Sequence, residues 1–146
     1  VYGWHNLTCP DFLTQEAPTF RKDARRYEAG TPNLLGLAGL SAALKMIQEV
    51  GVQAITDELL RKRKWFVPKL LTKGFKVLHS ETTENQIGGM ISIFSDSRDM
   101  RALHTALLKQ KIVSSIRSDS SGRSYLRFSP HYYNTDEELS RILNCL

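Results

Sequence analysis

The sequence predicts an α+β fold in which helices cover one face of a small antiparallel or mixed sheet. A helical repeat of apolar residues runs through residues 31–67, and short apolar runs of strand length follow it. The elements then come in the order helix, helix, strand, strand, helix, strand, strand, helix. The 146 residues are enough for one ordinary domain, and 41% hydrophobic with 24% charged residues is typical of globular proteins.

Two long helices are expected in the first half. Residues 1–30 show no sustained period and are expected to be irregular. Thr31-Pro32 places an N-cap threonine before a proline at the first helical position, so a helix is predicted from there to residue 50, ended by Gly51. A second helix is predicted over residues 52–67, with Pro68 kinking or ending it.

The second half is predicted to supply the sheet and two more helices. Strands are expected at 75–78, 90–94, 112–117 and 125–129, and a helix at 99–109. The polar run 118–122 reads as a turn. The last helix should begin at Thr135, because Glu138 three residues later completes a capping box.

Composition narrows the class of protein. No apolar run approaches the ~20 residues of a membrane span, and no signal pattern opens the chain, which starts at Val1 rather than Met. Cys9 and Cys145 are too few for a disulfide framework and are expected to be free thiols in a cytoplasmic protein. The net charge of +5 suits anionic partners.

No self-contained catalytic or nucleic-acid-binding motif is visible. A phosphate loop, a dinucleotide fingerprint and paired metal-ligand spacing are all missing from the sequence. The histidines are scattered and read as surface or half-buried residues, with a zinc site as the weaker alternative: His5, His79, His104 and His131. The basic run 61–64 reads as a solvated helix face, and Trp65 and Phe66 as core residues.

The segment Arg26-Tyr27-Glu28-Ala29-Gly30-Thr31-Pro32-Asn33 is the first candidate site. It places a glycine and a hydroxyl at a helix N-terminus, where free N–H groups and the positive end of the helix dipole attract anions. The residues alone favour the alternative that Thr31 caps its own helix.

Arg127 is the second candidate. Strand alternation places Leu126 and Phe128 on the core face and turns Arg127 to the other face, beside Tyr125 and Ser129. A guanidinium suits bidentate binding of a carboxylate. Spacing alone favours an ordinary exposed strand arginine.

At these two segments the sequence resembles the class V aminotransferase family of pyridoxal-phosphate (PLP) enzymes, which includes cysteine desulfurases and isopenicillin N epimerase. Residues 26–33 are similar to the family's R-[FY]-E-x-G-T-x-N segment, and residues 127–138 to its C-terminal R-x-S-x-x-x-Y-N-T-x-E-E signature. Gly3-Trp4 fits the stretch shortly after the family's active-site lysine. The likeness covers essentially the whole chain, in the right order and spacing.

The resemblance implies roles for four residues. Thr31 would donate its hydroxyl to the PLP phosphate, typically across the interface of a homodimer, and Gly30 would allow that close approach. Arg127 would bind the α-carboxylate of an amino-acid substrate, and Arg117 would line the same site. Residues 31–146 would form the C-terminal small domain of a fold type I enzyme, with residues 1–30 as a lead-in from its large domain.

Two departures shape the functional expectation. The large PLP-binding domain with its Schiff-base lysine is missing from this sequence, so the chain alone is expected neither to bind PLP nor to hold a catalytic residue. Residues 118–124, where desulfurases carry a nucleophilic cysteine, have none, which favours an aminotransferase- or epimerase-like parent. The alternative is a stand-alone binding or interaction module for an anionic partner.

Overall fold

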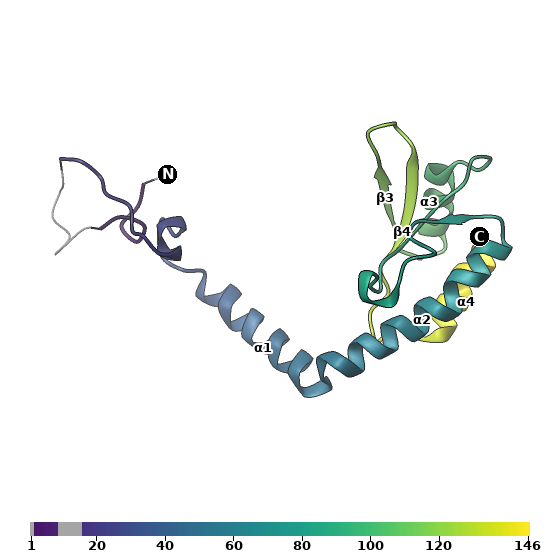
Figure 1. The fold of residues 1–146 in the computed structure, drawn as a ribbon, viewed down its shortest axis with the longest axis horizontal. Coiled ribbons are helices and arrows are strands. Elements are labelled where there is room, and N and C mark those ends of the chain that lie inside the picture. The colour runs from purple at the N-terminus through teal and green to yellow at the C-terminus, as the bar shows by residue number, and fades with distance from the viewer. Residues whose placement is uncertain (1, 9–15) are drawn as a thin grey trace. The chain divides into compact units, whose positions relative to one another are not determined.

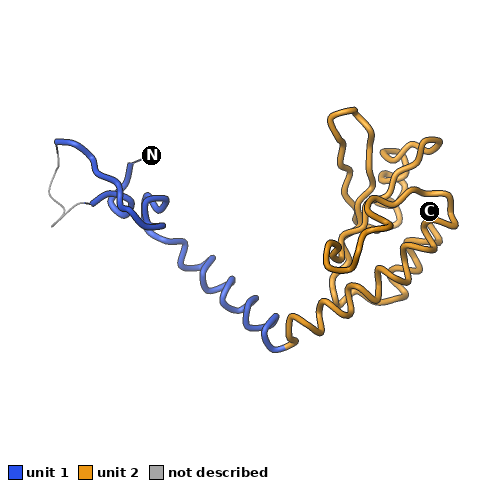
Figure 2. Tube along the Cα trace, viewed as in Figure 1, with its two compact units in different colours: residues 1–49 blue, residues 50–146 orange. Residues whose placement is uncertain are grey.

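The computed structural model describes residues 2–8 and 16–146, and the chain divides into two compact units, residues 1–49 and 50–146 (Figure 2). This division concerns packing within the chain. The expected assignment of residues 1–30 to a larger domain stays a prediction.

The N-terminal part of the first unit is mostly irregular, as expected. Leu7 and Phe20 form an isolated antiparallel bridge, and a short 3-10 helix, η2, covers Ala24–Tyr27. Gly3 packs directly on residue 29: a Cβ at Gly3 would lie 1.7 Å from the carbonyl oxygen of Ala29. Only glycine fits there without moving the backbone that leads into Gly30 and Thr31.

Helix α1 covers Leu34–Val50, so it starts later than predicted. Its capping residue is Asn33, whose side-chain Oδ1 accepts the N–H of Gly36 at 2.9 Å, while its carbonyl accepts the N–H of Leu37 at 2.9 Å. The prediction that Thr31 caps this helix is therefore wrong. Asparagine competes well for this position because its amide oxygen reaches the third N–H of the helix.

Helix α2 covers Val52–Thr72 and begins after Gly51, whose φ of +90° ends α1 as predicted. Pro68 lies inside α2, so of its two predicted effects the end of the helix near residue 67 is wrong, and the kink stays a prediction. The helix continues to Thr72 and is terminated by Gly74, with φ +82°, where the Gly74 and Phe75 N–H groups donate to the Leu71 and Leu70 carbonyls.

The second unit contains a four-stranded antiparallel sheet in the order β1-β2-β4-β3, formed by Lys76–Val77, Ile91–Phe94, Ser124–Phe128 and Ser115–Ser118. All four predicted strands are present. The third begins at Ser115 rather than residue 112, because the Ile112 N–H closes the preceding helix by donating to the Leu107 carbonyl at 2.9 Å. A short 3-10 helix, η3, covers Glu84–Gln86 between β1 and β2.

Helices α3, Met100–Lys109, and α4, Asp136–Cys145, complete the unit with α2 (Figure 1). Asp99 caps α3, and the predicted capping box of Thr135 and Glu138 opens α4. The helices pack on one face of the sheet, so the α+β prediction is confirmed. The fully buried side chains include Phe66, Leu70, Ile93, Leu107 and Leu126.

Within the described residues, no single helix has the length and apolar character to cross a membrane; only the bent pair α1 and α2 together meets that test, by length and composition alone.

Candidate functional site

The open face of the sheet carries the predicted arginines. Leu126 and Phe128 are 0% and 2% exposed on the core face, which confirms the predicted alternation. In the sheet register, Arg127 lies opposite Ser92 on β2 and Ser115 on β3, while Arg117 lies opposite Tyr125. Directly paired residues share a face, so Arg117 and Arg127 project to the same side.

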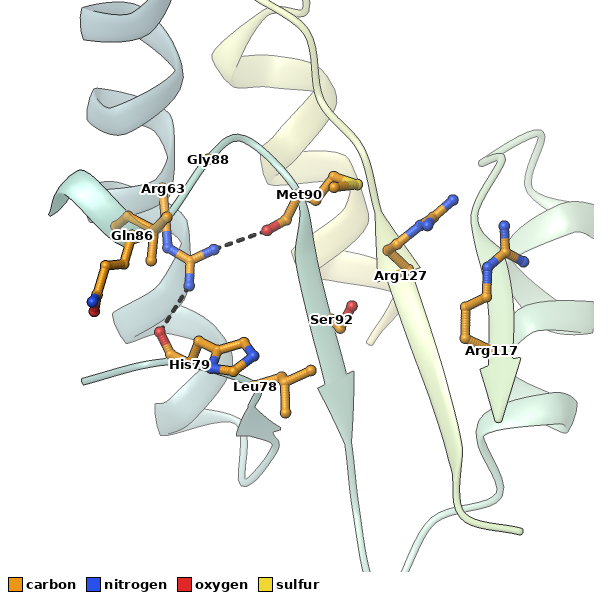
Figure 3. Close-up of a pocket in the computed structure, with 10 residues that line it drawn as sticks. Arg63, Leu78, His79, Gln86, Gly88, Met90, Ser92, Arg117 and Arg127 are labelled. Carbon is orange, nitrogen blue, oxygen red and sulfur yellow. Dashed lines mark hydrogen bonds between the residues drawn. The ribbon is translucent and has the colours of Figure 1, made fainter. Parts of the chain in front are cut away.

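One pocket of about 330 Å³ on this face brings both arginines together, and Figure 3 shows their side chains extending the same way from β3 and β4. The walls come from α2, from the segment between β1 and β2, and from the strands. The lining residues are Arg63, Leu78, His79, Gln86, Ile87, Gly88, Met90, Ser92, Arg117 and Arg127. The lining holds three guanidinium groups and no carboxylate.

Arg127 has a buried hydrogen-bond donor that no group in the described residues satisfies. Its Nε is buried without a hydrogen-bond partner, and among residues 2–8 and 16–146 no carboxylate forms an ion pair with Arg127 or Arg117. The Nη1 of Arg117 donates only to the neighbouring Ile116 carbonyl, at 2.8 Å. A buried donor without a partner costs stability, so an acceptor brought by a ligand would bind favourably here.

Arg63 is the residue that the sequence analysis placed wrongly. It is 6% exposed, and its guanidinium donates to the carbonyls of Met90 at 2.9 Å and His79 at 3.1 Å (Figure 3). These two carbonyls flank the segment between β1 and β2, so Arg63 ties both ends of one pocket wall to α2. Burial lowers the pKa of Arg63 from its usual value, yet an arginine remains cationic at neutral pH.

Lys62 is buried as well, at 1% exposed, so the predicted solvated face holds only for Arg61 and Lys64. Its Nζ donates to Glu58 at 2.6 Å and to the carbonyl of Tyr132 at 2.7 Å. Hydrogen bonds from Arg61 and then Lys62 lower the pKa of Glu58 to about 2.

The same network fixes the segment after β4. Arg61 bridges Glu58 and Asp136, each at 2.7 Å, which joins α2 to the start of α4. Within the segment, Asn134 Oδ1 accepts the His131 N–H at 2.7 Å. The C-terminal motif predicted from the sequence is therefore a rigid connection between β4, which carries Arg127, and α4.

The turn between β3 and β4 is closed by Asp119. Its side chain accepts hydrogen bonds from the Ser121 N–H and hydroxyl, the Arg123 N–H and the Tyr125 hydroxyl, at 2.6–3.1 Å. These bonds, from Ser121 first and then Tyr125, lower the pKa of Asp119 to about 2. The predicted turn is thus a tight hairpin held by its own side chains.

Thr31 and Gly30 belong to the first unit and lie in a shallow pocket formed by residues 28–33 together with Gly36, Leu37 and Leu40. Because Asn33 caps α1, the Thr31 hydroxyl is not used by its own helix. Across the described residues no hydrogen bond engages that hydroxyl, and a Cβ at Gly30 would meet nothing within 4 Å. An exposed hydroxyl beside the free N–H groups of a helix start is chemically suited to a phosphate.

The described part of the chain holds no group of three or more His, Cys, Asp or Glu residues that could bind a metal ion. Cys145 is a free thiol, as predicted. Cys9 lies outside the described residues, so its predicted state remains a prediction.

The family model of aminotransferase class-V matches residues 3–142. The chain belongs to the class-V aminotransferase family. An uncharacterized aminotransferase of Bacillus subtilis, YcbU, is 30% identical over 127 residues, 86% of this chain and 31% of that protein. A probable cysteine desulfurase of Pyrococcus abyssi is 30% identical over 135 residues, 83% of this chain and 32% of that protein.

Solved structures of cysteine desulfurases show the same fold. The apo cysteine desulfurase of Thermococcus onnurineus gives a TM-score of 0.81 at 19% identity, covering 99% of this chain and 37% of that one. The Escherichia coli cysteine desulfurase CsdA gives 0.80 at 18% identity, with the same shares covered. The chain therefore spans about a third of the length of its relatives.

Arg117 and Arg127, which were singled out from the sequence, both line this pocket, and their roles stay predictions. Arg63 and the wall that it holds were not predicted. The helical period did contain a signal: Arg63 falls in the stripe with Leu59, Phe66 and Leu70, four, three and seven residues away. Arg63 was predicted to be solvated because it is charged, although its position in the helical repeat lies on the buried side of α2. The role of His79, whose φ of +56° shapes the start of the wall, depends on backbone geometry that no sequence pattern marked.

Proposed function

We propose that this chain contributes the substrate-carboxylate and cofactor-phosphate contacts of a PLP-dependent enzyme of the class-V aminotransferase family that acts on an amino acid. Arg127 would bind the α-carboxylate in the pocket of the second unit, and Arg117 would line that pocket. The Schiff-base lysine would come from outside residues 1–146, and the active form would be a homodimer.

The observation that carries the proposal is Arg127. Its Nε is buried without a partner in a pocket that has no acidic lining residue, and it stands at the arginine of the family's C-terminal motif. A planar guanidinium can bind both oxygens of a carboxylate, which fixes the orientation of the substrate as well as adding energy. The segment after β4, which Lys62 and Arg61 join to α2, would hold Arg127 in that orientation.

Thr31 and Gly30 support the cofactor part of the proposal. When bound, PLP would supply the electron sink that stabilises charge at the α-carbon of the substrate. The free Thr31 hydroxyl and the N–H groups at the start of α1 would hold its phosphate. The absence of a cysteine in residues 118–124 and the closed Asp119 turn favour an aminotransferase- or epimerase-like reaction over sulfur transfer.

The test is to make Arg127→Ala and Arg127→Lys in the full-length enzyme and measure kcat/KM and Tm. Removing one partner of a partly desolvated charge pair costs on the order of 2–5 kcal/mol, or about 30- to several-thousand-fold in kcat/KM. Arg127→Lys should not restore the activity, because an ammonium group cannot donate two parallel hydrogen bonds to a carboxylate. Lys109→Ala, on an exposed part of α3, is the matched loss of a positive charge and should leave both quantities unchanged.

Two results would reject the role of Arg127. Activity within about threefold of wild type in both variants would remove the carboxylate contact. A joint collapse of Tm and activity would make Arg127 a structural residue. A separate assay mixes residues 1–146 with PLP and amino acids; a reducible adduct at one lysine together with turnover would show that the lysine lies within this chain.

A further inference from the structure

We infer that the substrate of the arginine pocket carries a second negative charge at the end of its side chain, and that Arg117 binds it while Arg127 binds the α-carboxylate. This inference rests on the proposed function and adds the substrate class: an amino acid with an anionic side chain.

The first argument is charge balance. The lining residues carry three guanidinium groups and no carboxylate. Arg63 donates to the two carbonyl oxygens of His79 and Met90, which carry no net charge. A single substrate carboxylate would leave the described pocket strongly positive, and a pocket lined by one sign of charge attracts ligands of the opposite sign.

The second argument is that nearby acids are already engaged. Asp119 lies on the turn that follows the strand of Arg117, but its oxygens accept bonds from Ser121, Arg123 and Tyr125. Glu84, in η3 beside the pocket wall, pairs with Lys64 at 2.5 Å. Among the described residues, neither carboxylate forms an ion pair with Arg117.

The third argument is spacing. Arg127 pairs with Ser115, and Arg117 stands two residues further along β3, so the two arginines are diagonal neighbours on one face. Diagonal positions lie roughly 7–8 Å apart, which suits two anionic groups separated by a short chain. Leu78, Ile87 and Met90 supply apolar walls for the methylene groups between them.

The experiment compares two ligands of equal length and different charge. Glutarate has two carboxylates, and glutaramate replaces one of them with a neutral amide. Each is titrated at low ionic strength into the isotope-labelled chain, in which Leu37, Leu40 and Leu44 of α1 are replaced by Gln to limit self-association; none of the three lines the arginine pocket. Amide chemical shifts of Gly88, Ser92 and residue 117 report binding. The variants are Arg117→Gln, Arg127→Gln and the control Lys109→Gln, with unchanged spectra outside the pocket as the check on folding.

The expected result is that glutarate binds about fivefold more tightly than glutaramate, the upper end for an ion pair at an exposed arginine. Arg117→Gln should abolish that preference and leave glutaramate binding unchanged, whereas Arg127→Gln should weaken both ligands. Lys109→Gln should do neither.

Other results overturn the inference in distinguishable ways. If the two ligands bind equally in the wild type but both need Arg127, the second charge is wrong and the carboxylate role of Arg127 stands. If Arg117→Gln weakens both ligands alike, both arginines hold one carboxylate. If Lys109→Gln also removes the preference for glutarate, that preference arises from long-range electrostatic attraction and not from contact with Arg117. If neither ligand shifts the pocket amides, the inference fails, and kcat/KM of the Arg127 variants in the full-length enzyme decides separately whether the proposed function stands.

Discussion

Helices α1 and α2 are consecutive, yet the more apolar helix, α1, is exposed and the more basic helix, α2, is partly buried. α1 has 17 residues, rich in leucine and alanine, and none of them is buried. α2 has 21 residues with a dense basic run, and it buries five, two of which are Lys62 and Arg63. Leu35 is 88% exposed, whereas Lys62 is 1% exposed.

The contrast shows that apolar character and burial are separate properties in this chain. α2 can bury two cations because carbonyl groups and Glu58 satisfy their donors. α1 exposes Leu34, Leu37, Leu40 and Leu44, which is the mark of a surface that binds another protein surface. The relatives that this chain matches are about three times as long, so they contain further protein surface beside the matched part.

Leucine-to-alanine substitutions in the two helices should give the largest difference. Leu70→Ala removes a side chain with no exposed surface from the core, so the free energy of unfolding should fall by about 2–5 kcal/mol. Leu40→Ala, at 54% exposure in α1, should change it by less than about 0.5 kcal/mol. Urea unfolding followed by circular dichroism measures both, and equal losses would mean that α1 shares in a core.

How far the sequence predicted the fold depends on whether the deciding interaction was local. The capping box at Thr135 and the alternation around Arg127 are local patterns, and both were predicted correctly. The end of α2 was not, because Pro68 removes one backbone bond while continuing the helix buries Leu70 and places Phe75 in the core. That gain comes from residues distant in sequence.

The residues of the candidate site divide in the same way, into those marked by a local sequence pattern and those placed by contacts distant in sequence. Arg117 and Arg127 were singled out from the sequence, and the sheet register brings them into one pocket; their roles stay predictions. Arg63 was missed because its partners are carbonyls from residues 79 and 90, which no motif connects to α2. Thr31 was read as a cap because Asn33, two residues later, was not weighed as a competitor.

Arg63→Met should have the next largest effect. It keeps a long apolar stem but leaves the carbonyls of His79 and Met90 without their donor, at a cost on the order of 3 kcal/mol. Lys73→Met, an exposed residue just after α2, should cost less than about 0.5 kcal/mol. Hydrogen exchange in residues 79–90 should speed up only in the first variant; unchanged exchange there would mean that Arg63 does not hold the pocket wall.

The exposed face of α1 should make residues 1–146 self-associate or remain poorly soluble. Replacing Leu37, Leu40 and Leu44 by Gln removes apolar side chains that each contribute on the order of 1.5–3 kcal/mol when buried. Light scattering should then show association weakened about tenfold or more. Lys45→Gln with Glu49→Gln, on the same helix, is the control. A wild-type chain that stays monomeric over a wide concentration range would contradict this reading of α1.

The smallest effect concerns the Asp119 turn and appears only in acid. The folded pKa of about 2 lies below the ordinary value of about 3.9, so the ionised carboxylate stabilises the fold above about pH 4 and this contribution is lost as the pH falls toward 2. The stability difference between wild type and Asp119→Asn should therefore shrink over that range. Glu58 titrates in the same window but is present in both proteins, so its contribution cancels. Ser120→Ala, in the same turn, is the control, and its stability difference from wild type should stay constant over the same pH range. A difference that stays constant from pH 6 to pH 2.5 would mean that charge on Asp119 does not hold the turn.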